Sequence, residues 1–270
     1  MTTLTAQRPR VTRRGLEVGL AFVRYLERTR KRVEDHFARQ LTDVFDDMGR
    51  AAARAYNARK VADPLVDAIV SDMDISGIRR RLHPMYGGTY QSAATLVMNG
   101  VADILSMPIS IGLRDQIAER VLAEGGRRVG LVDLAGQTRD AVFAALEEAR
   151  AEGLGIPQTA RRIRDYVSAG RYTVMEQARE GAGSAYRATL IARTETRYAT
   201  NVSVSQTGRA MGFEHYLAFD DRLGFGDAEC VARDGQVFTA DEMDGEISAE
   251  HPQGTLSFSP IPRTEVSEPD

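Results

Sequence analysis

The residues best suited to chemistry lie in the segment DAECVARDGQVF, residues 227–238, which contains the only cysteine of the chain. Cys230 could act as a nucleophile, as a metal ligand with Asp227 and His251, or as a buried thiol. A nucleophile needs a thiolate and an adjacent base, but the acidic neighbours of Cys230, such as Asp234, disfavour a thiolate. A zinc site with two or three ligands of mixed type is weak. We therefore predict a buried or half-buried thiol, with no catalytic residue, no metal and no cofactor.

A second group of charged residues lies in the sequence LIARTETR, where Arg193, Glu195 and Arg197 fall within five positions. Arg193 and Arg197 are four residues apart, so a helix brings these like charges onto one face, where they repel. We expect another group to neutralise them. It is either the acidic C-terminal region of this chain or a partner protein, while a solvated face is the remaining alternative.

The N-terminal segment is strongly basic, because residues 1–32 hold nine arginines and lysines against two acidic residues. Residues 216–270 show the opposite balance, with three basic and thirteen acidic residues. Basic side chains can bind phosphates by releasing counterions, and no aromatic ladder for base stacking accompanies them here. The predicted contacts to double-stranded DNA are therefore independent of sequence. They are Arg8, Arg10, Arg13, Arg14, Arg30, Lys31 and Arg32, and a solvated or protein-docking arm is the alternative.

The composition excludes several classes of protein. The 270 residues, 43% of them hydrophobic, suffice for one large domain or two modest ones, and one cysteine excludes a disulfide framework. We find no secretory leader and no apolar run of membrane-spanning length, so we expect no membrane association. The common nucleotide-binding, serine hydrolase and metalloprotease motifs are missing, which points away from an enzyme.

The spacing of apolar residues predicts a mainly helical fold with a small α+β region at the C-terminus. A long helix over about residues 15–60, interrupted or exposed near Arg30, would extend for about 65–70 Å at 1.5 Å per residue, and we expect part of it to project or pack on another chain. The other predicted helices cover 75–105 with a break at His83-Pro84 and Gly87-Gly88, 137–152, a segment from Pro157, and 174–208. Gly153 and Gly155 form the turn before Pro157. Three β-prone stretches, 215–219, 236–239 and 256–261, predict a small antiparallel sheet with long loops.

Five short motifs occur in a fixed order in the C-terminal half: a helix pair, then IARTETR, then DDR, then CVARDGQVF, and finally HPQGTLSFSP. In this order and spacing they resemble the Mu F-type phage head morphogenesis family, the minor head proteins of tailed phages. The matching residues are Arg193, Glu195, Arg197, Asp221, Arg222, Cys230, Asp234, Gly235, His251 and Pro252. The resemblance covers about residues 134–262. Three of the four cysteines in the family pattern are replaced here, by Asp227, Gly254 and Leu256, which removes the implied metal or disulfide clamp.

The resemblance implies a structural protein of the virion, located at the portal and inside the capsid. The implied partners are the phage portal protein and the major capsid protein, and the implied role is head assembly, with DNA packaging or retention as a further role. The implied division is a helical region 1–133 with the basic arm, a Mu F-like domain 134–262 and an acidic tail 263–270. Two alternatives remain: an ADP-ribosyltransferase-like or toxin-associated enzyme using Arg193 with Ser203-Val-Ser205, although no E-x-E follows, and a neck or scaffold protein without DNA contact.

Overall fold

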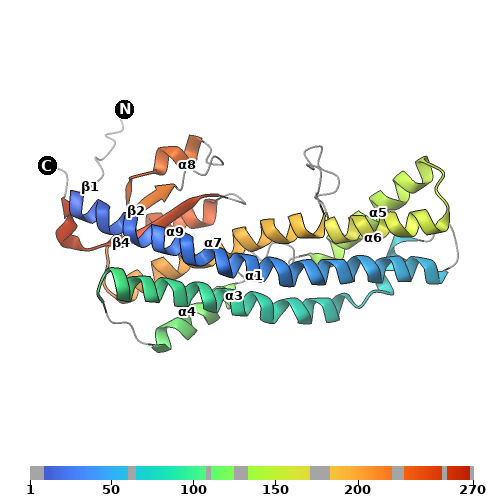
Figure 1. Ribbon diagram of the computed structural model, residues 1–270, viewed down its shortest axis with the longest axis horizontal. Helices are drawn as coiled ribbons and strands as arrows, with labels where there is room; N and C mark the ends of the chain where they lie inside the picture. The colour runs from blue at the N-terminus through green and yellow to red at the C-terminus, as the bar shows by residue number, and fades with distance from the viewer. Residues whose placement is uncertain are drawn as a thin grey trace, which may run out of the picture. The chain divides into compact units, whose positions relative to one another are not determined.

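The computed structural model describes residues 9–59, 65–107, 111–124, 133–170, 183–220, 228–250 and 254–267. Helices dominate this part of the chain, and a small antiparallel sheet lies near the C-terminus, which confirms the predicted fold class (Figure 1). The chain divides into two compact units: unit 1 is Met1–Val33, Gly87–Arg127 and Thr194–Asp270, and unit 2 is Glu34–Tyr86 and Arg128–Arg193. Three long helices contribute residues to both units. They are α1 (Arg13–Arg59), α3 (Ile75–Ile104) and α7 (Ser184–Ala210).

Unit 1 contains the sheet, in which β2 (His215–Asp220) lies between β3 (Val237–Thr239) and β4 (Leu256–Ile261), both antiparallel to it. Tyr216 is paired with Phe238 on one side and with Pro260 on the other. All three predicted strands are confirmed. The predicted long loop after β3 is wrong, because α9 (Ala240–Ala249) begins there with a capping box between Thr239 and Glu242.

Two helices of unit 1 pack on opposite faces of β2, since successive side chains of a strand point to opposite sides. On one face α1 approaches closely: a Cβ placed on Gly19 would lie 3.1 Å from the Phe219 ring. On the other face the Tyr216 hydroxyl donates to the carbonyl of Ser205 in α7, 3.4 Å away. The sheet therefore has helical cover on both faces, which explains why every residue of β4 is buried.

The two ends of the described chain meet in a second, two-stranded sheet. Here β1 (Arg10–Val11) pairs antiparallel with β5 (Val266–Ser267), which follows the short 3₁₀ turn η2 (Arg263–Glu265). Thr12 donates its hydroxyl to the Glu265 carboxylate, and the Arg14 guanidinium lies 3.6 Å from the same group. Part of the basic N-terminal segment is thus paired with part of the acidic C-terminal segment within one chain.

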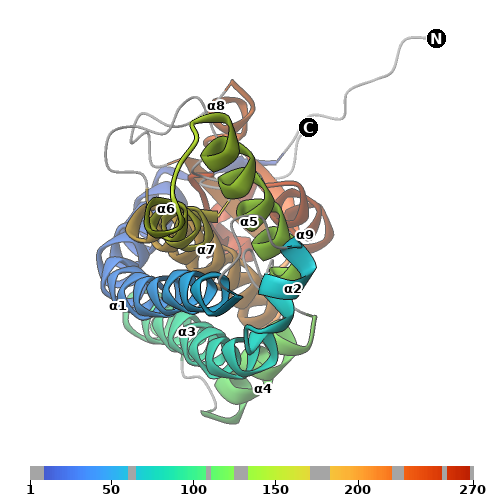
Figure 2. The ribbon, with the colours of Figure 1, turned by 90° about the vertical axis from the view of Figure 1, so that its right-hand side faces the viewer.

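Unit 2 is helical in its described part. It contains segments of α1, α3 and α7 together with α2 (Val66–Ser71), α5 (Leu134–Ala151) and α6 (Ile156–Ala169). Helix α2 packs beside α5 (Figure 2), with an ion pair of 2.7 Å from Arg139 to Asp67. The predicted turn between α5 and α6 is confirmed: Gly153 has a φ of +65°, which glycine adopts without strain, and Leu154 N–H donates to the Ala149 carbonyl.

Two expectations about the long helices, the interruption near Arg30 and the break at His83-Pro84 and Gly87-Gly88, are wrong. Helix α1 is continuous through Arg30, and most of its apolar stripe between Val23 and Met48 is buried within this chain. Helix α3 is likewise continuous through Pro84, whose side chain is exposed. Helix α7 begins at Ser184 in the described chain, and residues 171–182, where its start was predicted, lie outside the described residues. The remaining elements of unit 1 are α4 (Ile111–Glu124) and α8 (Ala228–Arg233).

Candidate functional site

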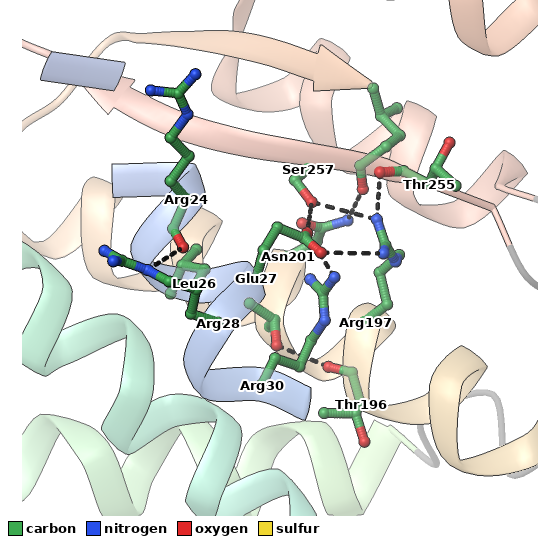
Figure 3. A network of polar contacts seen from close by, with 12 residues as sticks. Arg24, Leu26, Glu27, Arg28, Arg30, Thr196, Arg197, Asn201, Thr255 and Ser257 are labelled. Carbon is green, nitrogen blue, oxygen red and sulfur yellow. Dashed lines mark hydrogen bonds and ion pairs between the residues drawn. The ribbon is translucent and has the colours of Figure 1, made fainter. Parts of the chain in front are cut away.

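The most unusual group of side chains in unit 1 is a charged cluster held between α1, α7 and β4. Glu27 and Arg30 come from α1, Arg197 and Asn201 from α7, and Ser257 from β4 (Figure 3). The apolar stripe of α1 explains why Arg30 is there. Leu26, Arg30 and Val33 follow each other at spacings of four and three, so Arg30 occupies a core position of the stripe and is only 2% exposed.

A carboxylate lies at the centre of this charged cluster. Glu27 Oε1 accepts from Arg30 Nη2 at 2.5 Å and from the Ser257 hydroxyl at 3.1 Å. Glu27 Oε2 lies 3.6 Å from Arg197 Nη2. One carboxylate therefore bridges two guanidinium groups and a strand residue, as the dashed lines in Figure 3 show.

Arg197 extends the cluster to the backbone of the sheet. Its Nη1 donates to the carbonyl of Thr255, the residue before β4 begins at Leu256, and lies 3.3 Å from the Ser257 hydroxyl. One turn along α7, Asn201 Nδ2 donates to the Leu256 carbonyl at 2.9 Å. These contacts satisfy carbonyl groups at the start of β4, where the chain enters the sheet beside α7.

The electrostatic balance of the cluster favours the ionised form of Glu27. Burial by itself raises the pKa of this carboxyl, but the charges of Arg30 and Arg197, with hydrogen bonds from Arg30 and Ser257, outweigh it and hold the pKa below its usual value. Glu27 is thus a carboxylate at neutral pH. The guanidinium groups of Arg30 and Arg197 are stabilised because the Glu27 carboxylate supplies their negative counter-charge within the protein.

Glu195 lies two residues before Arg197 on α7 and is fully buried. Its Oε2 accepts a hydrogen bond of 2.7 Å from the Tyr90 hydroxyl of α3, also in unit 1. Glu195 therefore connects α7 to α3, while Arg197 connects α7 to α1 and β4. Two of the three charged residues of the IARTETR segment, Glu195 and Arg197, are consequently internal ties, and the neutralising group for Arg197 is Glu27 rather than the acidic C-terminal region or a partner.

The other residues of the predicted motifs are only partly described. Asp234 and Gly235 form the turn from α8 into β3, where Gly235 has a φ of +76° and donates its N–H to the Ala218 carbonyl at 2.9 Å. Arg193 is partly exposed on α7. Cys230 lies in α8, and the description does not extend to its side chain. Outside the described residues are Asp221, Arg222, Asp227, His251 and Pro252.

The predicted phosphate contacts have different surroundings. Arg13 pairs with Glu17 at 3.0 Å, Arg14 lies near Glu265, and Arg10 belongs to β1. Lys31 and Arg32 are exposed, and Arg8 lies outside the described residues. Arg30 corrects the prediction, because a buried guanidinium that is paired with Glu27 does not reach a phosphate.

The geometry of this charged cluster is that of a structural clamp. Among the described residues, no group of three or more metal-ligating side chains is placed to hold a metal ion. Ser203 and Ser205, which the enzyme alternative would use, are fully buried: Ser203 donates to the Ala199 carbonyl at 2.6 Å and Ser205 to Asp244 at 2.6 Å. Their hydroxyls are therefore engaged within the protein.

Three members of the cluster, Glu27, Asn201 and Ser257, were not predicted from the sequence, and neither was Tyr90, the partner of Glu195. One signal was present: the gap in the apolar stripe at Arg30, which was interpreted as an interruption of the helix. A charged residue at a core position of an otherwise regular stripe requires a buried counter-charge. For Arg30, the nearest candidate counter-charge on the same side of the helix is Glu27, three residues earlier.

None of the protein-family models, curated proteins or solved structures matches this chain. Across the described ranges, no helix combines the length and the apolar character that crossing a bilayer requires.

Proposed function

We propose that this chain is a minor head protein of a tailed phage, of the Mu F type, that acts structurally at the portal and on the inner side of the capsid. The proposal starts from the ordered motifs between residues 134 and 262. It is supported by the role of Glu195 and Arg197, which the motif pattern singles out and which tie α7 to α3, α1 and β4. Motif residues that serve internal ties fit a structural protein better than a reactive site.

The clamp gives this function a physical basis. A head protein must keep its shape while neighbouring subunits assemble around it. In unit 1 the charged cluster fixes the first half of α1 and the second half of α7 to the start of β4. Buried ion pairs favour one arrangement over alternatives, because any displacement leaves a buried charge without its partner. The surfaces of unit 1 are then presented to partners in a defined geometry.

The engagement of Ser203 and Ser205 favours the structural role over the ADP-ribosyltransferase-like alternative. Neither hydroxyl has solvent-accessible surface to offer a dinucleotide. An assay of NAD hydrolysis with the purified protein is expected to show no turnover. Turnover that disappears in an Arg193→Ala variant would overturn the structural reading.

The direct test is co-sedimentation of the purified chain with portal oligomers of the phage that encodes it, with the major capsid protein as a second candidate partner. We expect the wild-type protein to sediment with the portal fraction. Cys230→Ala is the matched control and is expected to sediment equally, since no role in assembly is proposed for this thiol. If the chain stays in the supernatant with both partners, or is accessible to protease on intact virions, the proposal fails.

A further inference from the structure

The outer face of the first half of α1 carries a row of three arginines. Arg24, Arg28 and Arg32 follow each other at intervals of four residues, and all three side chains are exposed. Arg28 Nε donates to the Arg24 carbonyl at 3.2 Å, so its side chain lies along the helix. Figure 3 shows Arg24 and Arg28 pointing away from the charged cluster around Glu27. Within the described ranges, none of the three forms an ion pair with a carboxylate.

The row differs from other exposed arginines in its regularity. Many arginines on the surface have a carboxylate beside them, as in Arg50 with Asp47 at 2.7 Å and Arg162 with Glu152 at 2.6 Å. Others without such a pair in the described chain lie apart from one another, and they include Arg54 farther along α1, Arg79 on α3 and Arg161 on α6. Only the row on α1, among these examples, lines up several such charges on one helical face.

Local stability does not account for the row. Like charges four residues apart on a helix repel, and Arg24–Arg28 and Arg28–Arg32 are two such pairs in succession. The fold of α1 comes from its opposite face, where Phe22, Leu26 and Arg30 are buried. Glutamine or alanine at the three outer positions would serve the helix equally well. An external anion that binds the row relieves the repulsion.

The spacing and chemistry of the row indicate which anion. Four residues of α-helix correspond to about 6 Å, so the three guanidinium groups start from points spread over about 12 Å. A ligand that meets all three carries a repeated negative charge, and arginine is suited to phosphate because it can donate two hydrogen bonds in parallel. The nearby aromatic residues are not displayed for base stacking: Phe22 is fully buried and Tyr25 is partly buried.

We infer that Arg24, Arg28 and Arg32 bind the sugar-phosphate backbone of duplex DNA, independently of sequence. This places the DNA contact on the side of α1 instead of on the N-terminal arm and Arg30. The inference rests on the proposed function for the choice of duplex DNA over another polyanion. DNA binding is tested without the portal protein. DNA binding can therefore fail while portal binding succeeds, and portal binding can fail while DNA binding succeeds.

The test compares the wild-type chain with the variant Arg24→Gln/Arg28→Gln/Arg32→Gln in binding to a fluorescently labelled duplex of arbitrary sequence. Affinity is measured by fluorescence anisotropy over a series of salt concentrations. Each phosphate contact contributes about −0.9 to the slope of log K against log salt, so loss of three contacts should make the slope shallower by about 2.7. The matched control is Arg54→Gln/Arg79→Gln/Arg161→Gln, which removes the same charge without removing a row and should keep the wild-type slope.

A second variant separates charge from folding. Arg24→Lys/Arg28→Lys/Arg32→Lys keeps the three charges and is expected to retain the salt slope, with reduced affinity because lysine donates as a point charge. Circular dichroism of all variants verifies that α1 remains helical. The inference is overturned if the wild-type protein does not bind duplex DNA at low salt, if both glutamine variants lose binding equally, or if the lysine variant binds as weakly as the row glutamine variant. Equal binding of poly-glutamate through the same row would overturn it as well, in favour of an acidic protein partner.

Discussion

Helix α7 buries two arginines ten residues apart, and the two units of the chain satisfy them in different ways. Arg197, in unit 1, is held by the Glu27 carboxylate that it shares with Arg30. Arg187, in unit 2, is 2% exposed and donates to the carbonyls of Val167 and Ser168 at the end of α6, at 3.2 and 3.5 Å, and to the side-chain oxygen of Gln137 at 3.3 Å. It also lies 3.9 Å from the centre of the Phe45 ring.

The difference shows two ways to bury a guanidinium group. The C-terminal end of a helix carries partial negative charge and unpaired carbonyls. The end of α6 therefore accepts hydrogen bonds from the Arg187 guanidinium group without an ionised side chain. In unit 1 the charge of Arg197 meets a full negative charge on α1. Unit 1 therefore depends on a charge balance, whereas the Arg187 site of unit 2 depends on helix-end dipoles and packing. Three predictions test this distinction.

The largest effect is expected for Glu27→Gln. The change keeps the shape of the side chain but leaves Arg30 and Arg197 close together without their shared anion. Breaking a buried ion pair by removing one partner typically costs about 3–5 kcal/mol, and we expect a decrease of that order in the free energy of unfolding, measured by chemical denaturation. Hydrogen exchange should show the loss of protection in unit 1.

Glu17→Gln is the matched control on the same helix, because both side chains of the Glu17–Arg13 ion pair are exposed. It is expected to change the stability by less than about 0.5 kcal/mol. If Glu27→Gln is as mild as this control, unit 1 does not depend on the charge balance and the comparison breaks down.

A smaller effect is expected for Arg187→Met, which keeps an apolar stem in the core and removes the guanidinium group. The carbonyls of α6 lose a donor and Phe45 loses its cationic neighbour, for which we expect a cost of about 2–3 kcal/mol. Protection against hydrogen exchange should fall in unit 2, at α6 and α7.

Arg193→Met serves as the control for this site, since Arg193 lies on the same helix and is partly exposed. Its expected effect is within about 0.5 kcal/mol. A loss of protection at β4 in the Arg187→Met protein, with none at α6, would show that the two sites are not separate in the way proposed.

The smallest effect is the acid dependence of unit 1. The pKa of Glu27 in the folded protein is lower than the ordinary glutamate value of 4.5, because the charges of Arg30 and Arg197 outweigh the effect of burial. Its stabilising contribution is therefore fully present above pH 4.5 and is lost as the pH falls through the folded pKa. The wild-type protein should lose more stability on acidification than Glu27→Gln, which has no carboxyl to titrate at this position.

Unit 2 provides an internal comparison for the acid measurement. Hydrogen bonds from Arg50 and then Arg81 hold the pKa of Asp47 low, but Asp47 is much more exposed and its pairs are weakened by salt. Denaturation midpoints at high salt isolate the Glu27 contribution. Identical acid profiles of wild-type protein and Glu27→Gln under these conditions would contradict the assigned shift.

Much of the fold could be predicted from the sequence, because periodic apolar residues and turn residues act locally. The β-prone residues in 215–219 and 256–261 marked the strands, and Gly153 with Gly155 marked the turn between α5 and α6. Local reasoning failed at Arg30 and at Pro84. It treated a charged residue within the apolar stripe and a helix-disfavouring proline as breaks, although the surrounding helix continues in both cases with many hydrogen bonds and a buried face.

The candidate site could be predicted only in part. Glu195 and Arg197 were identified because their motif order resembles a phage head family, but their partners Tyr90 and Glu27 lie more than one hundred residues away in the sequence. The enzyme alternative used Ser203 and Ser205 because of their order in the sequence. That order carries no information on whether their side chains are buried. The spacing of the apolar stripe placed Arg30, but not Arg32, at a core position, yet it did not show which residues across the fold share its buried cluster.

The sequence by itself determined the helical character, the position of the small sheet and the excess of positive charge near the N-terminus. These follow from side-chain period, turn chemistry and composition, which are properties of neighbouring residues. Only the tertiary structure decided which carboxylate neutralises Arg197 and which strand residues join the buried cluster around Glu27. The physical reason is that a buried charge is tolerated only where a distant part of the chain supplies its counter-charge, and that pairing is settled when α1, α7 and β4 pack together.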